Sequence, residues 1–300
     1  MLSAYTVYQN IELRLPAVTV DKSLIKLYGL QLPNGSTGRF KAKAAEIYTE
    51  TYEALLWKLR SGSLIHADET KISVGRNDGF VWVFANMEEV AFVYTETREA
   101  EMVQTFLKDF KGVLVSDFFA AYDGINCPQQ KCLVHLMRDL NDALYEHPYD
   151  EDLKRVVRGF ANLVKPMVDT VDRFGLKTRF LKRHLSSVVR FYKGLARMSP
   201  ASEIAVKCKE RFEKNRNKLF TFLKYDGVPW NNNNAEHAVK AFAMLRDVIK
   251  GVTSENGLRD YLVLLSICES CKYMGVDFLD FLRSGEKDVH AFAQSRRGRK

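Results

Sequence analysis

The alternation of hydrophobic and polar positions predicts three β-strands in the first third of the chain, at residues 64–74, 80–84 and 90–95. The triplet Asn77-Asp78-Gly79 between the first two strands is a hairpin signal. Strands joined by such short turns are typical of an antiparallel meander. Further along, the apolar run 113–116 predicts a strand buried on both faces, and residues 131–135 predict a fifth strand that leads into a helix.

Helical periodicity dominates the rest of the chain. Apolar residues recur at helical spacing in segments that predict helices at 21–28, 41–59, 98–110, 235–249, 258–273 and 277–283. Gly251 is the predicted stop of the helix at 235–249. Strand signals disappear between residues 150 and 225, so this part is predicted to be helical, with interruptions near Lys165-Pro166 and Ser199-Pro200.

The order of these elements predicts the fold class. The predicted order is three antiparallel strands, a helix, a strand, a short helix, a strand and then helices. This is the order of an α/β, ribonuclease-H-like fold interrupted by an all-α insertion. The expected parts are an N-terminal helical segment at 1–60, a catalytic core at 61–146 and 226–285, a basic all-helical insertion at 147–225, and a disordered basic tail at 286–300.

Composition adds a preference for polyanionic partners. The 300 residues carry 45 Lys and Arg against 37 Asp and Glu, a formal net charge of +8, which favours nucleic acid as a partner. The longest apolar run, Tyr261–Leu265, is far too short to cross a bilayer, and the first residues lack a signal-peptide pattern. Five irregularly spaced cysteines fit a reduced cytoplasmic protein with free thiols.

A carboxylate stands at the start of the predicted helix at 235–249. Pro229 and four asparagines supply turn and cap chemistry before it. Glu236 falls in the first turn, where a helix N-terminus favours a negative charge, and Lys240 lies one turn along on the same face. This arrangement fits a metal ligand beside a phosphate, and it also fits a capped helix with an ordinary first-turn acid.

Two aspartates stand on predicted strands. In the first strand His66 and Asp68 share a face and Glu69 points the other way, so only one of the adjacent acids can enter a given site. The strand by itself does not decide which face that site occupies. Asp117 follows the buried run at 113–116, where ligands collect in open α/β sheets, or it caps the turn that comes next.

Two aspartates on strands and a glutamate on a later helix form a specific combination. Three convergent carboxylates hold one or two hard divalent cations. Two such ions, about 3.5–4 Å apart, activate a water or hydroxyl and stabilise the leaving oxygen of a phosphodiester. On a basic chain this combination predicts phosphoryl transfer on nucleic acid.

Four segments, in this order, resemble the insertion sequence 66 family of DDE transposases over roughly residues 60–285. They are His66-Ala67-Asp68-Glu69-Thr70, Val113–Asp117 with Ala121-Tyr122-Asp123, Cys132–His135, and Asn232-Asn233-Asn234-Ala235-Glu236. The resemblance implies a ribonuclease-H-like core in which Asp68, Asp117 and Glu236 form the catalytic, metal-binding triad. It also implies Mg²⁺ (or Mn²⁺), as two ions, and favours Asp68 over Glu69.

Three further residues are candidates for supporting roles. His66, His135 and Lys240 are candidates for positioning phosphate or ordering the site. Cys132 and His135 are spaced like zinc ligands, but no partner pair is evident for a four-ligand site. Many transposases carry a similar Cys-x-x-His near the active site, so a supporting role for His135 is expected, with a buried structural histidine as the alternative. Cys268-x-x-Cys271 lies in a predicted helix and is expected to pack in the core.

The chain departs from the family pattern in two places. Asn231 stands where members often carry Asp, and either residue suits a helix cap. Members usually carry a zinc-finger-like segment and further DNA-binding sequence upstream, whereas fewer than seventy residues precede Asp68 and none of them is a cysteine. A catalytic part without the usual end-recognition part is therefore expected.

Basic residues concentrate in the predicted insertion. Between Asp172 and Glu203 there is no acid, although eight basic residues occur there. Such a block either contacts DNA phosphates or covers a solvated helix face, and the lack of balancing acids favours DNA. The DNA-binding candidates are Arg173, Lys177, Arg179, Lys182, Arg183 and Arg190. Phe180, Phe191 and Tyr192 are interleaved with them and either stack on bases or pack in the core.

The expected function is that of a transposase that cuts DNA and transfers strands of an insertion element with divalent metal ions. The alternatives are a catalytically silent DNA-binding remnant and a structure-specific nuclease of the same fold. Expected partners are double-stranded DNA and further copies of the chain, in a homodimer or higher assembly, without a membrane. The expected location is the cytoplasm of a prokaryote, at the nucleoid.

Overall fold

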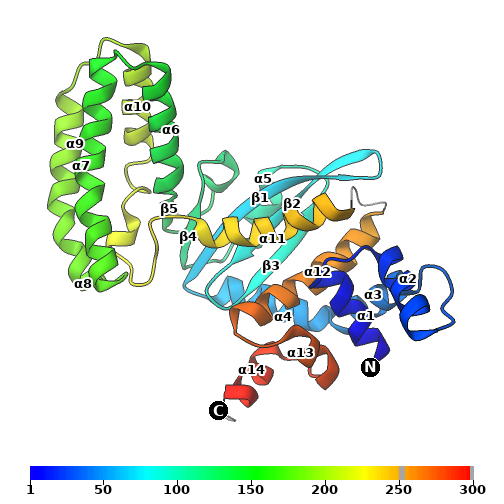
Figure 1. Cartoon of the computed structure of the whole chain (residues 1–300). Helices are drawn as coiled ribbons and strands as arrows, with labels where there is room; N and C mark the ends of the chain where they lie inside the picture. The colour runs from blue at the N-terminus through cyan, green and yellow to red at the C-terminus, as the bar shows by residue number, and fades with distance from the viewer. Residues whose placement is uncertain (250–253, 298–300) are drawn as a thin grey trace. The chain divides into compact units, whose positions relative to one another are not determined.

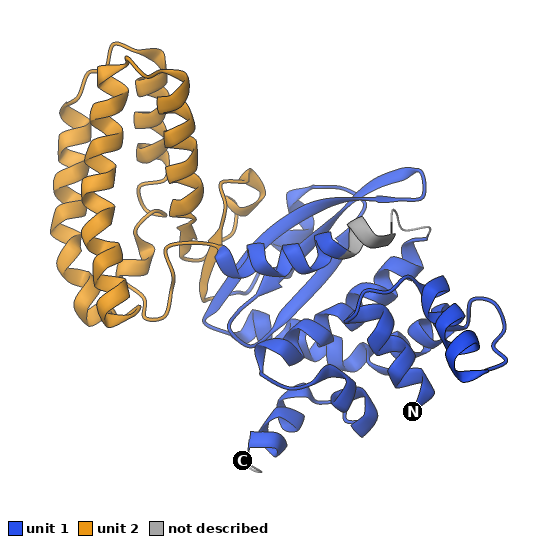
Figure 2. Ribbon diagram, in the orientation of Figure 1, with its two compact units in different colours: residues 1–110, 233–300 blue, residues 111–232 orange. Residues whose placement is uncertain are grey.

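The structure is a computed structural model that describes residues 1–249 and 254–297. It divides into two compact units (Figure 2). Unit 1 consists of Met1–Phe110 with Asn233–Lys300, and unit 2 consists of Lys111–Asn232. The expected helical insertion at 147–225 falls within unit 2, and the finer division into four parts stays a prediction.

The protein is a mixed α/β protein whose described residues form a five-stranded mixed sheet, in the strand order β3-β2-β1-β4-β5. Unit 1 contributes an antiparallel meander of β1 (Leu64–Val74), β2 (Asn77–Ala85) and β3 (Val90–Thr95) (Figure 1). Unit 2 contributes the parallel pair β4 (Val113–Ser116) and β5 (Gln129–Lys131). The meander is confirmed, and β1, β3 and β4 have the predicted bounds.

The hairpin turn between β1 and β2 differs from the prediction. It lies at Gly75-Arg76, because Gly75 adopts the left-handed backbone that a two-residue turn requires, with φ of +61°. The triplet Asn77-Asp78-Gly79 instead continues β2, so its assignment as the turn was wrong. Gly79 has a packing role there, since a Cβ at this position would lie 2.5 Å from the ring of Tyr94.

Unit 1 contains nine helices within the described residues: α1 (Leu2–Ile11), α2 (Ala17–Tyr28), α3 (Ser36–Ile47), α4 (Thr49–Ser61), α5 (Ala100–Phe106), α11 (Asn233–Ile249), α12 (Glu255–Tyr273), α13 (Phe278–Ser284) and α14 (Val289–Arg297). The single helix predicted at 41–59 is two helices, because Tyr48 leaves helical geometry at φ −103° and ψ 14°. The tail was predicted to be disordered, but α14 forms within it. Gly251, Arg299 and Lys300 lie outside the described residues.

The core of unit 1 lies on one face of its three strands. Helix α12 packs on β3, and α11 packs on β1 and β2. Side chains that meet there are fully buried, among them Val83, Phe92, Phe242, Leu262 and Leu265. Cys268 and Cys271 are buried in the same cluster, which confirms their prediction as core residues. On the opposite face Phe84 packs against Phe106 of α5, with ring centroids 4.3 Å apart.

Unit 2 is mostly helical, with α6 (Leu133–Glu146), α7 (Glu151–Phe174), α8 (Thr178–Leu181), α9 (Leu185–Arg197), α10 (Glu203–Lys214) and the short 3-10 helices η1 (Ala120–Tyr122), η2 (Lys182–His184) and η3 (Thr221–Leu223). The break predicted at Ser199-Pro200 is confirmed, between α9 and α10. The break predicted at Lys165-Pro166 was wrong, because α7 continues through Pro166. Buried residues on both sides of Pro166, Leu163 and Met167, hold the helix in place.

Two further features of the fold bear on the predictions. Residues 133–135 begin α6 instead of ending a strand, so His135 lies in the first turn of a helix. Throughout residues 1–249 and 254–297, every helix is too short or too polar to cross a bilayer.

Gly79→Ala is expected to lower the free energy of unfolding by about 1–3 kcal/mol, because the new methyl group would overlap the buried Tyr94 ring. Gly194→Ala is the control: Gly194 is exposed in α9 and a Cβ there meets nothing within 4 Å. That change should stabilise by roughly 0.5–1 kcal/mol. Urea unfolding measures both, and equal effects would contradict the packing role of Gly79.

Candidate active site

The pleat of β1 decides which of the two adjacent acids faces the core helices. Asp68 lies directly opposite Val83, and Val83 is buried in the cluster that Phe242 of α11 joins. Residues directly opposite in an antiparallel pair point to the same face. Asp68 therefore lies on the face that α11 covers, and one of its oxygens accepts the N–H of Glu69 at 2.9 Å.

Glu69 belongs to the other face. It pairs opposite Trp82, and its buried carboxylate forms an ion pair with Arg98. His66 lies two residues before Asp68 on the same face, opposite Ala85, and is 1% exposed. Asp68 and His66 therefore lie on the side of α11, and Glu69 lies on the other side.

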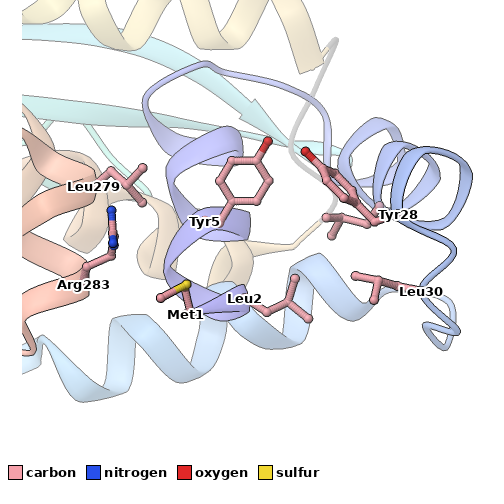
Figure 3. Close-up of a pocket in the computed structure, with 8 residues that line it drawn as sticks. Met1, Leu2, Tyr5, Tyr28, Leu30, Leu279 and Arg283 are labelled. Carbon is pink, nitrogen blue, oxygen red and sulfur yellow. The ribbon is translucent and has the colours of Figure 1, made fainter.

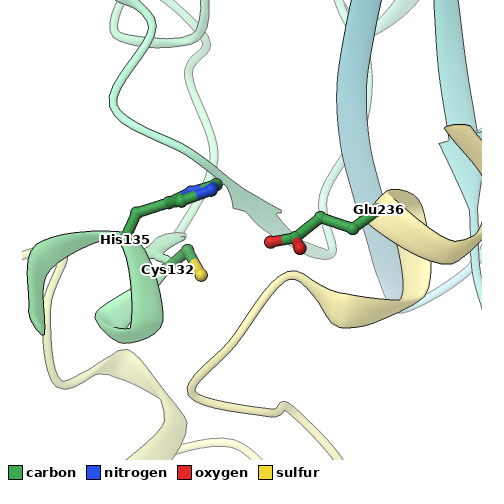
Figure 4. A group of neighbouring side chains, drawn as sticks. All are labelled: Cys132, His135 and Glu236. Carbon is green, nitrogen blue, oxygen red and sulfur yellow. The ribbon is translucent and has the colours of Figure 1, made fainter. Parts of the chain in front are cut away.

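Glu236 lies in the first turn of α11, and Figure 4 shows its side chain extending from the start of that helix. It is partly buried, whereas Lys240, one turn along, is exposed. Because α11 packs on β1, unit 1 brings Glu236 and Asp68 to one side of its strands. A site built from a strand residue and a residue at a helix start requires that both lie on the same side of the sheet.

Asn234 anchors the start of α11 to its surroundings in unit 1. Its amide donates to the carbonyl of Asn86 at the end of β2 (2.6 Å), and its side-chain oxygen accepts from the hydroxyl of Tyr273 in α12 (2.6 Å). Burial raises the pKa of Tyr273 to about 12, so the hydroxyl keeps the proton that it donates. These contacts hold the turn that carries Glu236.

Asp117 lies at the carboxyl end of β4 in unit 2. One of its oxygens accepts the N–H of Phe119 at 2.9 Å, so it caps the following turn and also stands at a strand end. The parallel strand β5 ends at the same edge, where the N–H of Cys132 donates to the carbonyl of Ser116 (2.8 Å). Both of the roles considered for Asp117 are compatible with this geometry.

Cys132 and His135 lie at the start of α6, as Figure 4 shows. Cys132 is buried, and its sulfur accepts the N–H of Asn232 at 3.3 Å. His135 is half-buried in the first turn of the helix. Burial raises the pKa of the Cys127 thiol to about 11.

Lys131, which the sequence patterns did not single out, is a buried cation in β5 with 1% exposure. Its ammonium lies 3.3 Å from the hydroxyl of Ser116 and 3.5 Å from a carboxylate oxygen of Asp123. Burial lowers the pKa of Lys131, and the carboxylates of Asp123 and Asp117 act in the opposite direction. The only sequence signal was a lysine in a predicted strand, and that signal alone does not reveal burial.

The basic candidates all lie on the surface of unit 2. Arg173, Lys177, Arg179, Lys182, Arg183 and Arg190 are exposed, and four of them fall within residues 177–183. Among the described residues none of these six forms an ion pair with a carboxylate. Their excess positive charge is therefore available to an external anion.

The interleaved aromatic residues divide into two groups. Tyr192 is 2% exposed, and Phe191 packs against the ring of Phe212 with centroids 5.3 Å apart, so both belong to the helical core. Phe180 stacks on Phe174 at 4.3 Å near the end of α7, with the guanidinium of Arg179 over its ring. Core packing, the alternative to base stacking, holds for Phe191 and Tyr192.

A separate apolar cavity of about 490 Å³ lies in unit 1, beside the N-terminal helices and α13 (Figure 3). Its lining includes Leu2, Tyr5, Tyr28, Leu30, Leu279 and Arg283. None of the predicted site residues lines it, and its apolar walls offer no carboxylate to a metal ion. The chemistry described above therefore lies elsewhere.

Comparison with known proteins agrees with these features. The model of the Transposase IS66 family matches residues 1–260, most of the chain. The chain therefore belongs to the IS66 family of transposases. Two similar proteins, both from Sinorhizobium fredii (strain NBRC 101917 / NGR234), are the uncharacterized proteins y4qI and y4jD.

These relatives are distant and longer. The identity to y4qI is 22% over 267 residues, which cover 76% of this chain and 48% of the relative. The identity to y4jD is 23% over 313 aligned positions, which cover 92% of this chain and 60% of the relative. The chain thus spans about half to three fifths of the length of these relatives.

Asn234→Ala is expected to destabilise the protein by about 1–3 kcal/mol, because the part-buried carbonyl of Asn86 and hydroxyl of Tyr273 lose the Asn234 side chain as a partner. Tyr273→Phe removes only the hydroxyl, and the double variant should show a coupling energy of about 0.5–3 kcal/mol. Urea unfolding of the four proteins measures it. Strictly additive effects would show that Asn234 does not hold α11 through Tyr273.

Proposed function

We propose that this protein is a DDE-type transposase that cleaves DNA and joins strands at the ends of an insertion element. Membership of the IS66 transposase family carries this proposal. The shared face of Asp68 and Glu236 in unit 1 supports it, because a catalytic carboxylate pair must come from the same side of the sheet. We further propose that the five-stranded sheet is a ribonuclease-H-like core with a helical insertion, which the strand order supports.

The proposed metal ligands are Asp68, Asp117 and Glu236. Three carboxylates are a donor set of hard oxygen ligands, which fits Mg²⁺ or Mn²⁺ and does not fit a thiolate-preferring metal. Two bound ions would supply activation of the attacking water or hydroxyl and stabilisation of the leaving oxygen. The role of the protein is to hold the carboxylates in place beside the reacting phosphate.

Other side chains have proposed positioning roles. Lys240 is exposed one turn beyond Glu236, where its ammonium suits a phosphate oxygen of the bound DNA. His66 is buried on the face of Asp68 and is proposed to order that carboxylate. His135 follows the parallel strand that pairs with the strand of Asp117, and we propose the same kind of supporting role for it.

The exposed basic residues of unit 2 are proposed to contact DNA phosphates. They extend from Arg173 to Arg190 and pair with no acid in the described part of the chain. Each neutralised phosphate releases counterions, so such contacts bind DNA without reading its sequence. An assembly of two or more copies on DNA, at the nucleoid of a prokaryotic cytoplasm, completes the proposal.

Asp68→Asn, Asp117→Asn and Glu236→Gln are each expected to abolish Mg²⁺-dependent cleavage of a duplex that carries the element's terminal repeats. Removing one carboxylate removes a metal ligand, while the isosteric amide preserves the fold. Cleavage and strand joining are measured on gels with labelled DNA, and circular dichroism checks folding. Cleavage without any joining by the unaltered protein would indicate the nuclease alternative instead.

Glu69→Gln is the matched control, because this neighbouring acid points to the opposite face of β1. It should retain most of the metal-dependent cleavage when the variant is folded. If Glu69→Gln abolishes cleavage and Asp68→Asn does not, the assignment of the catalytic face is wrong. If the unaltered protein binds DNA but never cleaves it with either metal, the silent remnant is the better description.

Replacing Arg179, Lys182 and Arg183 together with Ala is expected to flatten the salt dependence of DNA binding. The unaltered protein, with about 6–10 phosphate contacts, should lose roughly 10³–10⁵ in affinity between 50 and 200 mM salt. Loss of three contacts lowers the log–log slope by about 0.9 per contact. Fluorescence anisotropy with a labelled duplex measures both slopes.

The control for charge is a triple variant of Lys43, Lys71 and Lys207 to Ala. Each of these exposed lysines is paired with a carboxylate, at 2.9, 2.6 and 2.6 Å respectively. Their removal changes the net charge by the same amount and should leave the slope unchanged. Equal slopes for both triple variants would show that the basic block of unit 2 only faces solvent.

A further inference from the structure

A lysine buried in the parallel strand pair is unusual, because removing an ammonium group from water is costly unless it is paired. Lys131 of β5 is 1% exposed and lies directly beside β4, the strand that immediately precedes Asp117. We propose that Lys131 is a positioning residue that fixes the loop carrying Asp117 in the geometry that metal binding needs. This inference rests on the proposed function, which makes Asp117 a metal ligand.

The ammonium of Lys131 touches both ends of the segment on which Asp117 lies. At one end it is 3.3 Å from the hydroxyl of Ser116, the residue immediately before Asp117. At the other end it is 3.5 Å from the carboxylate of Asp123, which follows η1. The ring of Tyr122 lies between, with the ammonium 5.6 Å from its centroid. One cation thus closes the segment into a loop.

Within the loop, turns follow one another without a regular element longer than one turn. Asp117 accepts the N–H of Phe119 (2.9 Å), and the N–H of Asp123 donates to the carbonyl of Ala120 (3.0 Å). Contacts from outside the loop add to these short-range bonds: Gln129 donates to the carbonyl of Tyr122 (2.8 Å), and Lys218 donates to Asp123 (2.9 Å). Lys131 contacts both Ser116, immediately before Asp117, and Asp123, so it joins the two ends of the loop.

The backbone of Lys131 is itself held from two sides. Its N–H donates to the carbonyl of Lys218 (2.8 Å), and its carbonyl accepts from the side chain of Gln130 (2.7 Å). Register places it opposite Ser116 in the parallel pair. Because both its backbone and its surroundings are fixed, the side chain acts as a rigid support for the loop.

Asp123 is paired with Lys218 as well as with Lys131. Burial raises the pKa of Asp123, but the hydrogen bond from Lys218 and the charge of Lys131 outweigh burial and lower it below its usual range. Lys218 approaches the same carboxylate at 2.9 Å. A variant without the ammonium of Lys131 therefore leaves Asp123 paired, so its effect on the loop can be separated from loss of an ion pair.

Two possible roles of Lys131, through its charge or through the position of the loop, predict opposite changes in metal affinity when it is removed. A cation beside Asp117 repels a metal ion, so if Lys131 acted through its charge alone, removing it would tighten metal binding. If Lys131 holds the loop, removing it lets Asp117 leave its place and weakens metal binding. Loss of a group that orients a metal ligand typically costs about 10–100-fold in metal affinity.

The test is Lys131→Met, which keeps the length of the side chain and removes its ammonium. Mn²⁺ affinity of the full chain is measured by isothermal titration calorimetry, and the Mg²⁺ concentration for half-maximal DNA cleavage is measured in parallel. Both are expected to move about 10–100-fold toward weaker binding. The maximal cleavage rate at saturating Mg²⁺ should fall less than the affinity does, because excess metal restores occupancy.

Lys214→Met is the matched control. Lys214 lies 4.0 Å from the same Asp123 carboxylate, is 75% exposed and does not reach Ser116. It should change the Mn²⁺ affinity less than twofold. Ser116→Ala is the second variant, in case Lys131→Met does not fold. It removes the hydroxyl that Lys131 reaches, which also donates to the carbonyl of Asp117 (3.0 Å), and it should weaken Mn²⁺ binding several-fold.

The outcomes separate the inference from the function on which it rests. The positioning role is wrong if folded Lys131→Met binds Mn²⁺ as tightly as the unaltered protein, or more tightly. If Lys131→Met does not fold, the same result in Ser116→Ala overturns it. Either result leaves the proposed function intact. An equal loss in Lys214→Met would assign the effect to surface charge and also overturn it. If Asp117→Asn binds Mn²⁺ as the unaltered protein does, the metal site itself is misassigned and both proposals fail.

Discussion

The two-residue period of β1 is the constraint on which the candidate site in unit 1 depends. Ile72 and Val74 must reach the apolar core under α11 and α12, and the same period carries Asp68 to that face. A slip of one residue would place Glu69 there and expose the apolar positions. The free-energy cost of exposing Ile72 and Val74 therefore also keeps Asp68, a polar residue, on this face.

In unit 2 the constraint is of a different kind. β5 consists of three consecutive polar residues, all buried. Their side chains form hydrogen bonds with backbone groups of irregular segments. Gln129 donates to the carbonyls of Tyr122 and Ile125, and Gln130 accepts from the N–H of Phe222. Buried polar groups that are paired in this way fix one arrangement, because any other leaves several of them unsatisfied. A short, well-defined strand edge beside Asp117 is the result.

The surface of unit 2 complements its interior. The helices α7, α9 and α10 share a core of packed rings, including Phe160 and Phe212 at 5.1 Å, and this core leaves the basic residues outside. The apolar stripe of a helix determines its buried face, so the charges on the other face are free to vary with the partner. A basic surface on a rigid helical bundle suits a polyanion whose backbone is regular.

Strong local patterns were sufficient for several features. Alternation and apolar runs predicted the bounds of β1, β3 and β4, and the motif at Glu236 predicted the start of α11 closely. These elements are determined by period and by apolar content, both of which are visible in a single segment. Membership of the transposase family also followed from short segments, which occur in the order that is typical of the family.

Tertiary structure decided the rest. The turn lies at Gly75-Arg76, where Gly75 adopts a left-handed backbone, and Gly79 pairs within β2 beside the ring of Tyr94. Helix α7 continued through Pro166 because packing of its apolar stripe outweighs one lost backbone hydrogen bond. The face of Asp68 and the burial of Lys131 depend on partners distant in sequence, α11 for the first and Ser116 with Asp123 for the second. The sequence alone determined which residue types were present and in which local elements; only long-range packing decided which of them meet, because neither burial nor strand pairing is a property of one segment.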